Sequence, residues 1–115
     1  MRLPPEATDE ATGSAQANRT ELSGTLLERG SLRYTPAGIP VIEFRIAHHS
    51  EQREAGIDRR VECEIACIAL GTTALLLKDT GPGIGMHTTG FLAARSLKQK
   101  TPVLHVTRID FTEHS

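Results

Sequence analysis

The sequence predicts an all-β fold of five strands with one short helix between the third and fourth strands. Short apolar stretches recur between turn-forming residues at intervals suited to strands, and several alternate apolar with polar residues. One segment of good helix formers lies between two of these stretches. The chain has 115 residues, which is enough for one buried core, so we expect a single folded domain.

The first 17 residues differ in composition from the rest of the chain. They are rich in Ala, Thr, Pro, Ser and acids, and Leu3 is their only large aliphatic residue beside Met1. We therefore expect a disordered tail at 1–17 and a folded domain at 18–112. The chain start lacks the pattern of a secretory signal, and no apolar run reaches the roughly 20 residues that span a bilayer. These features predict a cytoplasmic protein that is not embedded in a membrane.

The first two strands are predicted at 20–29 and 41–49. In the first strand, Gly24 permits the bend that a barrel strand needs. The second strand has the period of two that is typical of a sheet with one buried face. Its apolar face consists of Ile42, Phe44 and Ile46. Glycines and prolines between the two strands indicate a connecting loop.

The polar segment at 50–58 is interpreted as an exposed loop, and the third strand follows at 59–70. Threonines before the good helix formers of 74–78 predict a capped helix of one or two turns. The last two strands are predicted at 86–95 and 103–111. Three strands, a short helix and two further strands form the order of an OB-fold barrel.

The two cysteines, Cys63 and Cys67, fall on one face of the third strand. A disulfide within one strand has poor geometry, so we expect two buried, reduced thiols. A metal site would need convergent ligands, but the neighbours His48 and His49 point to opposite faces of a strand. The sequence predicts neither a metal ion nor another cofactor.

The segment between the last two strands has three basic residues and no acid. These residues are Arg95, Lys98 and Lys100. In an OB barrel, oligonucleotides contact this loop and the connection between the first two strands. That connection contains Arg29 and Arg33, and Tyr34 offers a ring on which a base can stack. The alternatives are a loop that only increases solubility, and a tyrosine ring that covers a loop.

Further candidates for nucleic-acid contact lie on the strands. Arg45 and His49 share the polar face of the second strand, and Arg59 begins the third. Each has the alternative interpretation of an ordinary solvated charge. For catalysis the chain has no Gly-x-Ser-x-Gly motif, and its acids Glu62 and Glu64 lie close in sequence to arginines as ordinary surface charges. An enzyme is not expected.

The net charge of the chain is −1. Removing the tail, with Arg2, Glu6, Asp9 and Glu10, leaves 12 basic and 11 acidic residues, or +1. Electrostatic attraction for a nucleic acid therefore depends on where the basic residues lie rather than on their total number.

Several short motifs together resemble the primosomal replication protein N (PriB) family. They are Leu-Ser-Gly at 22–24, Pro-x-Gly-Ile-Pro at 36–40 and His-x-Ser-x-x-x-Glu-x-Gly at 48–56. The resemblance extends from Asn18 to about Phe111. It implies a homodimeric OB fold, related to single-stranded DNA-binding proteins. It also implies a non-catalytic role in replication restart at stalled forks, together with the helicase PriA and other primosome proteins such as the loader DnaT.

The resemblance also assigns expectations to single positions. The basic residues Arg95, Lys98 and Lys100 match a lysine-rich loop of the family, and Arg33 falls at a basic position. His49 replaces a residue that is often arginine.

Two positions depart from the family pattern. Ile57 and Glu62 stand where some members present aromatic rings to bases. We therefore expect modest, strongly salt-dependent affinity for single-stranded DNA, since aromatic stacking is largely missing.

Three functions remain open from the sequence. The first is a DNA-binding accessory of replication restart, which the motifs favour. The second is a protein-interaction adaptor of the primosome with only weak DNA binding. The third is an RNA-binding OB protein of translation, which fits the fold but not the motifs.

Overall fold

The computed structural model describes residues 16–112, so the predicted tail at 1–17 lies almost wholly outside the described residues. In chain order the elements are β1 (Thr20–Arg29), β2 (Arg33–Tyr34), β3 (Pro40–Glu54), β4 (Ile57–Leu70), α2 (Thr72–Leu77), β5 (Gly85–Ala94) and β6 (Pro102–Thr112). The five long strands and the helix between β4 and β5 confirm the predicted all-β fold. β2 is a two-residue addition within the connection that follows β1.

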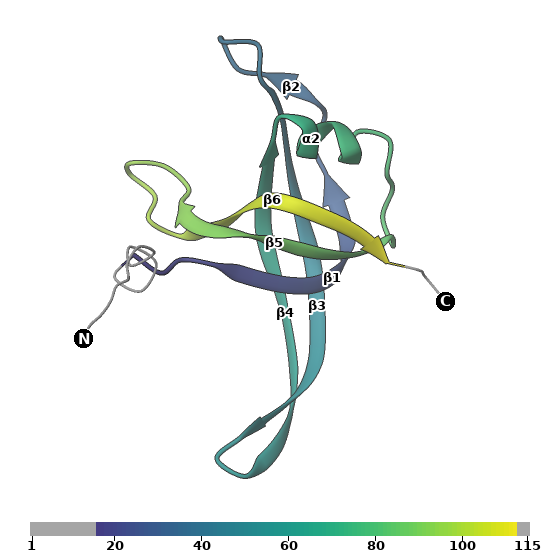
Figure 1. Cartoon of the computed structure of the whole chain (residues 1–115), viewed down its shortest axis with the longest axis vertical. Helices are drawn as coiled ribbons and strands as arrows, with labels where there is room; N and C mark the ends of the chain where they lie inside the picture. Colours follow the sequence, from purple (N-terminus) through teal and green to yellow (C-terminus); the bar gives the residue numbers. More distant parts are fainter. Residues whose placement is uncertain (1–15, 113–115) are drawn as a thin grey trace, which may run out of the picture.

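All six strands belong to one sheet, in the order β1-β5-β6-β4-β3-β2, and β1 also pairs with β3. This additional pairing closes the sheet on itself. β1 makes the closure by changing partners along its length, since residues 20–25 pair with β5 and residues 25–29 pair with β3. In Figure 1, β5 and β6 cross β3 and β4, as strands of a closed OB-type sheet do.

The hydrophobic core fills the inside of the closed sheet. The predicted apolar face of β3 is confirmed, because Ile42, Phe44 and Ile46 are each at most 3% exposed. Leu26 of β1 belongs to the same buried cluster. α2 contacts β3, β4 and β6 and places Leu77 in this cluster, so the short helix helps to cover the core.

Two glycines allow neighbouring strands to approach each other closely. A Cβ atom added at Gly24 would lie 2.6 Å from the carbonyl oxygen of Ala47, so glycine lets β1 approach β3 there. A Cβ atom added at Gly90 would overlap the carbonyl oxygen of His105 on β6. The close approach of the β3 backbone is therefore a second reason for glycine at position 24, in addition to the bend that the sequence predicts.

β3 and β4 extend beyond the closed sheet as a long two-stranded hairpin. We call residues 49–62 of this hairpin the arm. Its pairing runs from His49 opposite Glu62 to Glu54 opposite Ile57. Figure 1 shows the arm projecting away from the rest of the molecule.

The predicted loop at 50–58 is therefore wrong, because most of it is strand. Both faces of the arm are mostly polar, with Ile57 and Val61 as exceptions, so the sequence there lacks the alternation that identifies a half-buried strand. The turn itself needs only two residues, Ala55 and Gly56, which both have positive φ angles, of 53° and 79°. Such a turn is typical of tight hairpins.

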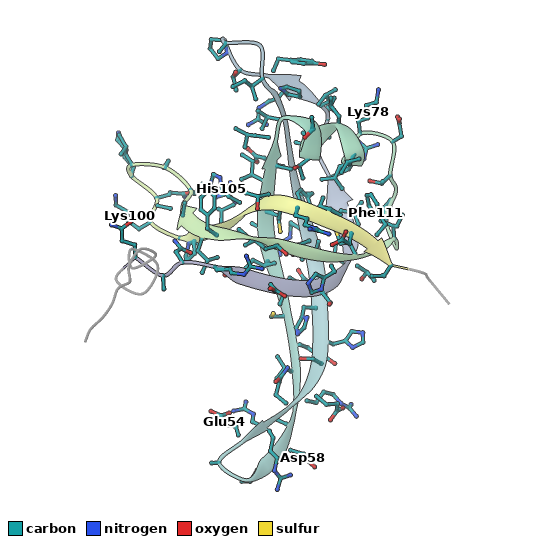
Figure 2. The ribbon with its side chains drawn as sticks, viewed as in Figure 1. Glu54, Asp58, Lys78, Lys100, His105 and Phe111 are labelled. Atoms are coloured by element: carbon teal, nitrogen blue, oxygen red, sulfur yellow. The ribbon has the colours of Figure 1, made fainter. Side chains whose placement is uncertain are left out.

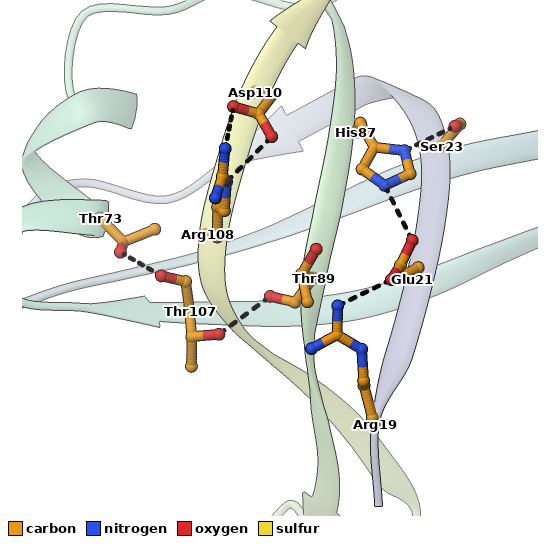
Figure 3. Close-up of polar contacts among 9 residues, drawn as sticks. All are labelled: Arg19, Glu21, Ser23, Thr73, His87, Thr89, Thr107, Arg108 and Asp110. Carbon is orange, nitrogen blue, oxygen red and sulfur yellow. Dashed lines mark hydrogen bonds and ion pairs between the residues drawn. The ribbon is translucent and has the colours of Figure 1, made fainter.

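The predicted threonine cap of the helix is also wrong. The N-cap position is Gly71, which has a φ of 71°, and no side chain caps the helix. The hydroxyl of Thr73 instead donates a hydrogen bond of 3.2 Å to the carbonyl oxygen of Thr107 on β6. Thr107 in turn donates to the carbonyl oxygen of Thr89 on β5 (Figure 3). Thr73 thus links α2 to β6 of the sheet.

The two cysteines lie in different surroundings, which corrects the expectation that both are buried. Cys67 is buried and Cys63 is exposed. The cause is the arm, because Cys63 stands where β4 leaves the closed sheet. Burial raises the pKa of the Cys67 thiol to about 12, although the charge of Arg45 opposes the shift.

Candidate nucleic-acid interface

The polar sides of β3 and β4 form one continuous surface, which we call the outer face. Because Ile42, Phe44 and Ile46 point into the core, the alternate residues of β3 point outward. In register, the outer face consists of Glu43, Arg45, Ala47 and His49 on β3 with Ile68, Ala66, Glu64 and Glu62 on β4. Acids and bases are therefore mixed on the strands where the sequence predicts DNA contacts.

Arg45 lies on the outer face, as predicted, but it has a carboxylate partner. Its guanidinium donates a 2.8 Å hydrogen bond to Glu64 on β4. This bond raises the pKa of Arg45 above its ordinary value, against the opposing effect of burial. Arg45 thus remains a cation, and a DNA phosphate at this place would have to compete with Glu64.

Glu43 brings together two predicted residues from different parts of the chain. Arg33 of β2 donates a 3.0 Å hydrogen bond to one oxygen of this carboxylate. Arg95, at the end of β5, has a guanidinium nitrogen 3.9 Å from the other oxygen. The connection after β1 and the loop after β5 therefore meet at one acid of β3.

A hollow of about 410 Å³ lies beside this meeting point. Its polar lining consists of Glu28, Arg29, Glu43, Arg45 and Arg95. A smaller hollow of about 170 Å³ shares Glu43 and Arg95 with it and extends to His105 on β6. We call the larger one the arginine hollow.

The sequence marks Arg29 as a basic residue at the start of the connection after β1, but it gives no sign that Phe91 belongs to this surface. Arg29, the last residue of β1, lines the arginine hollow. Phe91 is 39% exposed and stacks on the ring of His105, with ring centroids 5.0 Å apart. Only the pairing of β5 with β6 brings these rings together, and the sequence does not show that pairing.

The basic loop, residues 95–101, is a tight hairpin between β5 and β6. Its ends are joined by a 3.1 Å hydrogen bond from the amide of Arg95 to the carbonyl oxygen of Thr101. Lys98 and Lys100 are exposed, and neither forms an ion pair within the part of the chain that the structure describes. Leu97 beside them is 91% exposed. Both lysines of this loop tip are therefore open to solvent.

The arm contains the predicted residues Arg59 and His49, at some distance from the basic loop. Figure 2 shows Glu54 and Asp58 near the end of the arm and Lys100 on the separate loop. Arg59 forms an ion pair with Glu54 across the turn. His49 lies at the base of the arm, where it lines a shallow hollow with Glu62.

The predicted residues therefore occupy three places. Arg45 and Arg95 line the arginine hollow, and Arg33 pairs with its lining residue Glu43. Tyr34 neighbours Arg33 on β2 with 59% of its surface exposed. The two lysines lie on the basic loop, and His49 and Arg59 lie on the arm.

Residues 16–112 contain neither a cluster of metal ligands nor a membrane-spanning helix. No group of three or more His, Cys, Asp or Glu side chains is arranged there to hold a metal ion. No helix in this range is long and apolar enough to cross a membrane.

Sequence comparisons identify relatives over most of the chain. The profile of a family described as "another single-strand binding protein family" matches residues 18–108. Replication restart protein PriB of Nitrosomonas europaea is 43% identical over 93 residues, which is 81% of this chain and 86% of that protein. PriB of Bordetella pertussis is 53% identical over 76 residues, which is 66% of this chain and 71% of that protein.

Solved structures show the same relationship. PriB from Ralstonia solanacearum superposes with a TM-score of 0.76 at 33% identity, over 85% of this chain and all of that one. The single-stranded DNA-binding protein of Thermus aquaticus superposes with a TM-score of 0.67 at 26% identity, over 84% of this chain and 50% of that one. Sequence and fold agree, and the chain belongs to the PriB family of replication restart proteins, which has the fold of single-strand binding proteins.

Proposed function

We propose that this chain is a non-catalytic accessory of bacterial replication restart that binds single-stranded DNA. The names of its relatives support a role in replication restart, and the single-stranded DNA-binding protein with the same fold supports single-stranded DNA as the ligand. The observation on which the proposal rests is the basic loop, where Lys98 and Lys100 are exposed and pair with no carboxylate between residues 16 and 112. Lysines in this state can exchange counterions for phosphates at little cost.

The proposed DNA path crosses the molecule from the basic loop to β2. Phosphates contact Lys98 and Lys100 at one end, and the strand then passes the arginine hollow. At the other end Arg33 and the exposed ring of Tyr34 complete the path. The arm lies at the opposite end of β3 from β2, so His49 and Arg59 offer only a separate, weaker branch of the path, and Arg59 is already ion-paired.

Affinity is expected to be modest and dependent on salt. Exposed rings are few, so charge supplies most of the binding free energy. The test is a titration of an oligothymidine of about 16 nucleotides at roughly 50 and 200 mM salt. Tight binding that ignores salt, or no binding at either concentration, would contradict the proposal.

A second candidate is an adaptor that joins the helicase PriA and the loader DnaT and barely touches DNA. The ion pairs on the outer face favour it, because glutamates there already neutralise Arg33 and Arg45. The double variant Lys98→Glu/Lys100→Glu separates the two functions. Loss of oligonucleotide binding supports the DNA proposal, whereas intact binding with failed stimulation of the helicase supports the adaptor.

Three further parts of the proposal need their own measurements. We propose a homodimer, which light scattering of the purified chain tests. We also propose that residues 18–112 fold without the tail, which thermal unfolding of the shortened chain tests. Comparison of DNA with RNA oligonucleotides of one sequence tests the choice of nucleic acid.

A further inference from the structure

Glu43 occupies a place that suits a phosphate better than an ordinary surface acid. Each of its carboxylate oxygens faces a guanidinium from a different element, Arg33 at 3.0 Å and Arg95 at 3.9 Å. About half of its side chain, 48%, is exposed, so solvent ions reach it. No other carboxylate in the described chain joins the connection after β1 to the basic loop.

The adjoining arginine hollow contains one guanidinium that is fixed without an acid. The Nε atom of Arg29 donates a 2.7 Å hydrogen bond to the carbonyl oxygen of Thr80, and Nη1 donates a 3.3 Å bond to that of Gly30. Between residues 16 and 112 it has no carboxylate partner. Its charge is thus held in place but not neutralised.

The charged side chains that line the arginine hollow have a net positive charge that one anion would neutralise. Arg29, Arg45 and Arg95 contribute three positive charges, and Glu28 and Glu43 contribute two negative ones, which leaves one positive charge. A phosphodiester has one negative charge and two equivalent oxygens, like a carboxylate, and arginine binds both groups in the same bidentate manner.

We propose that the arginine hollow is a subsite for one phosphodiester of the bound strand, and that Glu43 is the internal competitor of that phosphate. This inference rests on the proposed function. In the free protein Glu43 holds Arg33 and Arg95 in position. In the complex the phosphate takes over Arg95, with Arg29 as a second donor, and Glu43 keeps at most Arg33. The exchange of one anion for another releases fewer counterions than binding to free cations, so Glu43 lowers both the affinity and its salt dependence.

The first test is the variant Glu43→Gln, which removes the competing charge and keeps the shape of the side chain. Its matched control is Asp110→Asn, which changes the net charge equally. Asp110 pairs with Arg108 at 3.1 Å on β6, and neither residue lines the hollow (Figure 3). At roughly 50 mM salt we expect Glu43→Gln to bind oligothymidine about three- to tenfold more tightly than the wild type. The log-log salt slope should steepen by about 0.7, the value for one extra phosphate contact on a single strand, and Asp110→Asn should stay within about twofold.

A double-mutant cycle gives a second readout that does not depend on net charge. Arg95→Gln should weaken binding by about twofold in the wild type and by more, about fivefold, in the Glu43→Gln background, where Arg95 is free for phosphate. Coupling of this sign supports the inference. The side chain at position 43 is exposed, so the Glu43→Gln variant should fold normally. An unchanged melting temperature would show that its fold is intact.

The outcomes separate this inference from the proposed function. If the wild type binds DNA and Glu43→Gln behaves like Asp110→Asn with no coupling to Arg95, the subsite is overturned and the basic loop remains. If only Glu43→Gln binds, Glu43 is a competitor that prevents binding altogether, and DNA binding by the wild type, as proposed above, is overturned. If no variant binds DNA at any salt concentration, both the subsite and the proposed function are overturned.

Discussion

The arm and the basic loop are two hairpins of the same molecule that each have three cations, yet they differ in what those cations contact. Every arginine of the arm has a carboxylate partner on the arm itself. The pairs are Arg53 with Asp58, Arg59 with Glu54 and Arg60 with Glu51. The basic loop contains no acid, and among residues 16–112 only its Arg95 reaches one, Glu43, at 3.9 Å.

The difference shows that the number of cations on a hairpin does not determine its attraction for DNA. An exposed ion pair is worth only about 0–1 kcal/mol to the fold, but a phosphate must displace the carboxylate before it gains the contact. The loop lysines need no such exchange. We infer that the loop supplies most of the electrostatic attraction and that the arm supplies little.

The largest effect is expected from adding rings to the arm. The double variant Ile57→Phe/Glu62→Trp places aromatic side chains at two exposed positions of a hairpin that now has none. Stacking is worth about 1–3 kcal/mol per base, so one productive stack tightens binding about tenfold. Fluorescence titration with oligothymidine measures the change.

The matched control for this variant is Ile57→Leu/Glu62→Gln, which removes the same charge without adding a ring. It should bind within about threefold of the wild type, since it alters a single charge. If the aromatic variant does no better than this control, DNA does not pass along the arm.

A smaller loss is expected when the loop is made more like the arm. Gln99→Glu places a carboxylate between Lys98 and Lys100, and the side chain of Gln99 is exposed. The new acid competes with phosphates for both lysines, so affinity at roughly 50 mM salt should fall about fivefold. Gln52→Glu on the arm is the control and should change it less than about twofold. Equal effects at the two positions would show that the loop has no special role.

A still smaller gain is expected when the arm is made more like the loop. The triple variant Glu51→Gln/Glu54→Gln/Asp58→Asn frees the three arginines of the arm. Binding should tighten about threefold at low salt and approach the wild-type value at high salt, because the new contacts are screened. Unchanged affinity at low salt would place the DNA path away from the arm.

The contrast between the two hairpins also marks how far the sequence predicts the structure. The alternation of Ile42, Phe44 and Ile46 predicts β3 correctly, because burial of one face leaves a period of two in the sequence. The arm is polar on both faces, so its strands leave no such period and appear as a loop. Local pattern therefore predicts the closed sheet and misses its extension.

The candidate site divides in the same way. Lys98 and Lys100 are predictable because a run of basic residues without acids is visible in the sequence. The role of Glu43 is not, since Arg33 and Arg95 lie 10 and 52 positions from it and only the folded sheet brings them together. A sequence shows which charges a segment has, but not which of them the fold neutralises.

The boundary between the arm and the closed sheet can be located with the two cysteines of β4, which lie four positions apart. Burial raises the pKa of Cys67 to about 12, so its thiol stays protonated and shielded near pH 8. Cys63 is exposed at the base of the arm. We expect iodoacetamide to modify one cysteine in the native protein and both in denaturant, as mass spectrometry would show.

The same modification is expected to have the smallest effect on binding. Carbamidomethylation of Cys63 adds no charge, so oligothymidine affinity should change less than about twofold.

The raised pKa of Cys67 also makes the free energy of unfolding depend on pH. The thiol of the unfolded chain ionises from about pH 8.5, whereas the thiol of the folded chain stays protonated. The free energy of unfolding should therefore decline as the pH rises from about 8.5 towards 12, whether or not Cys63 is modified. Rapid labelling of both cysteines in the native protein would contradict this boundary, because it would show that β4 opens as far as Cys67, inside the closed sheet.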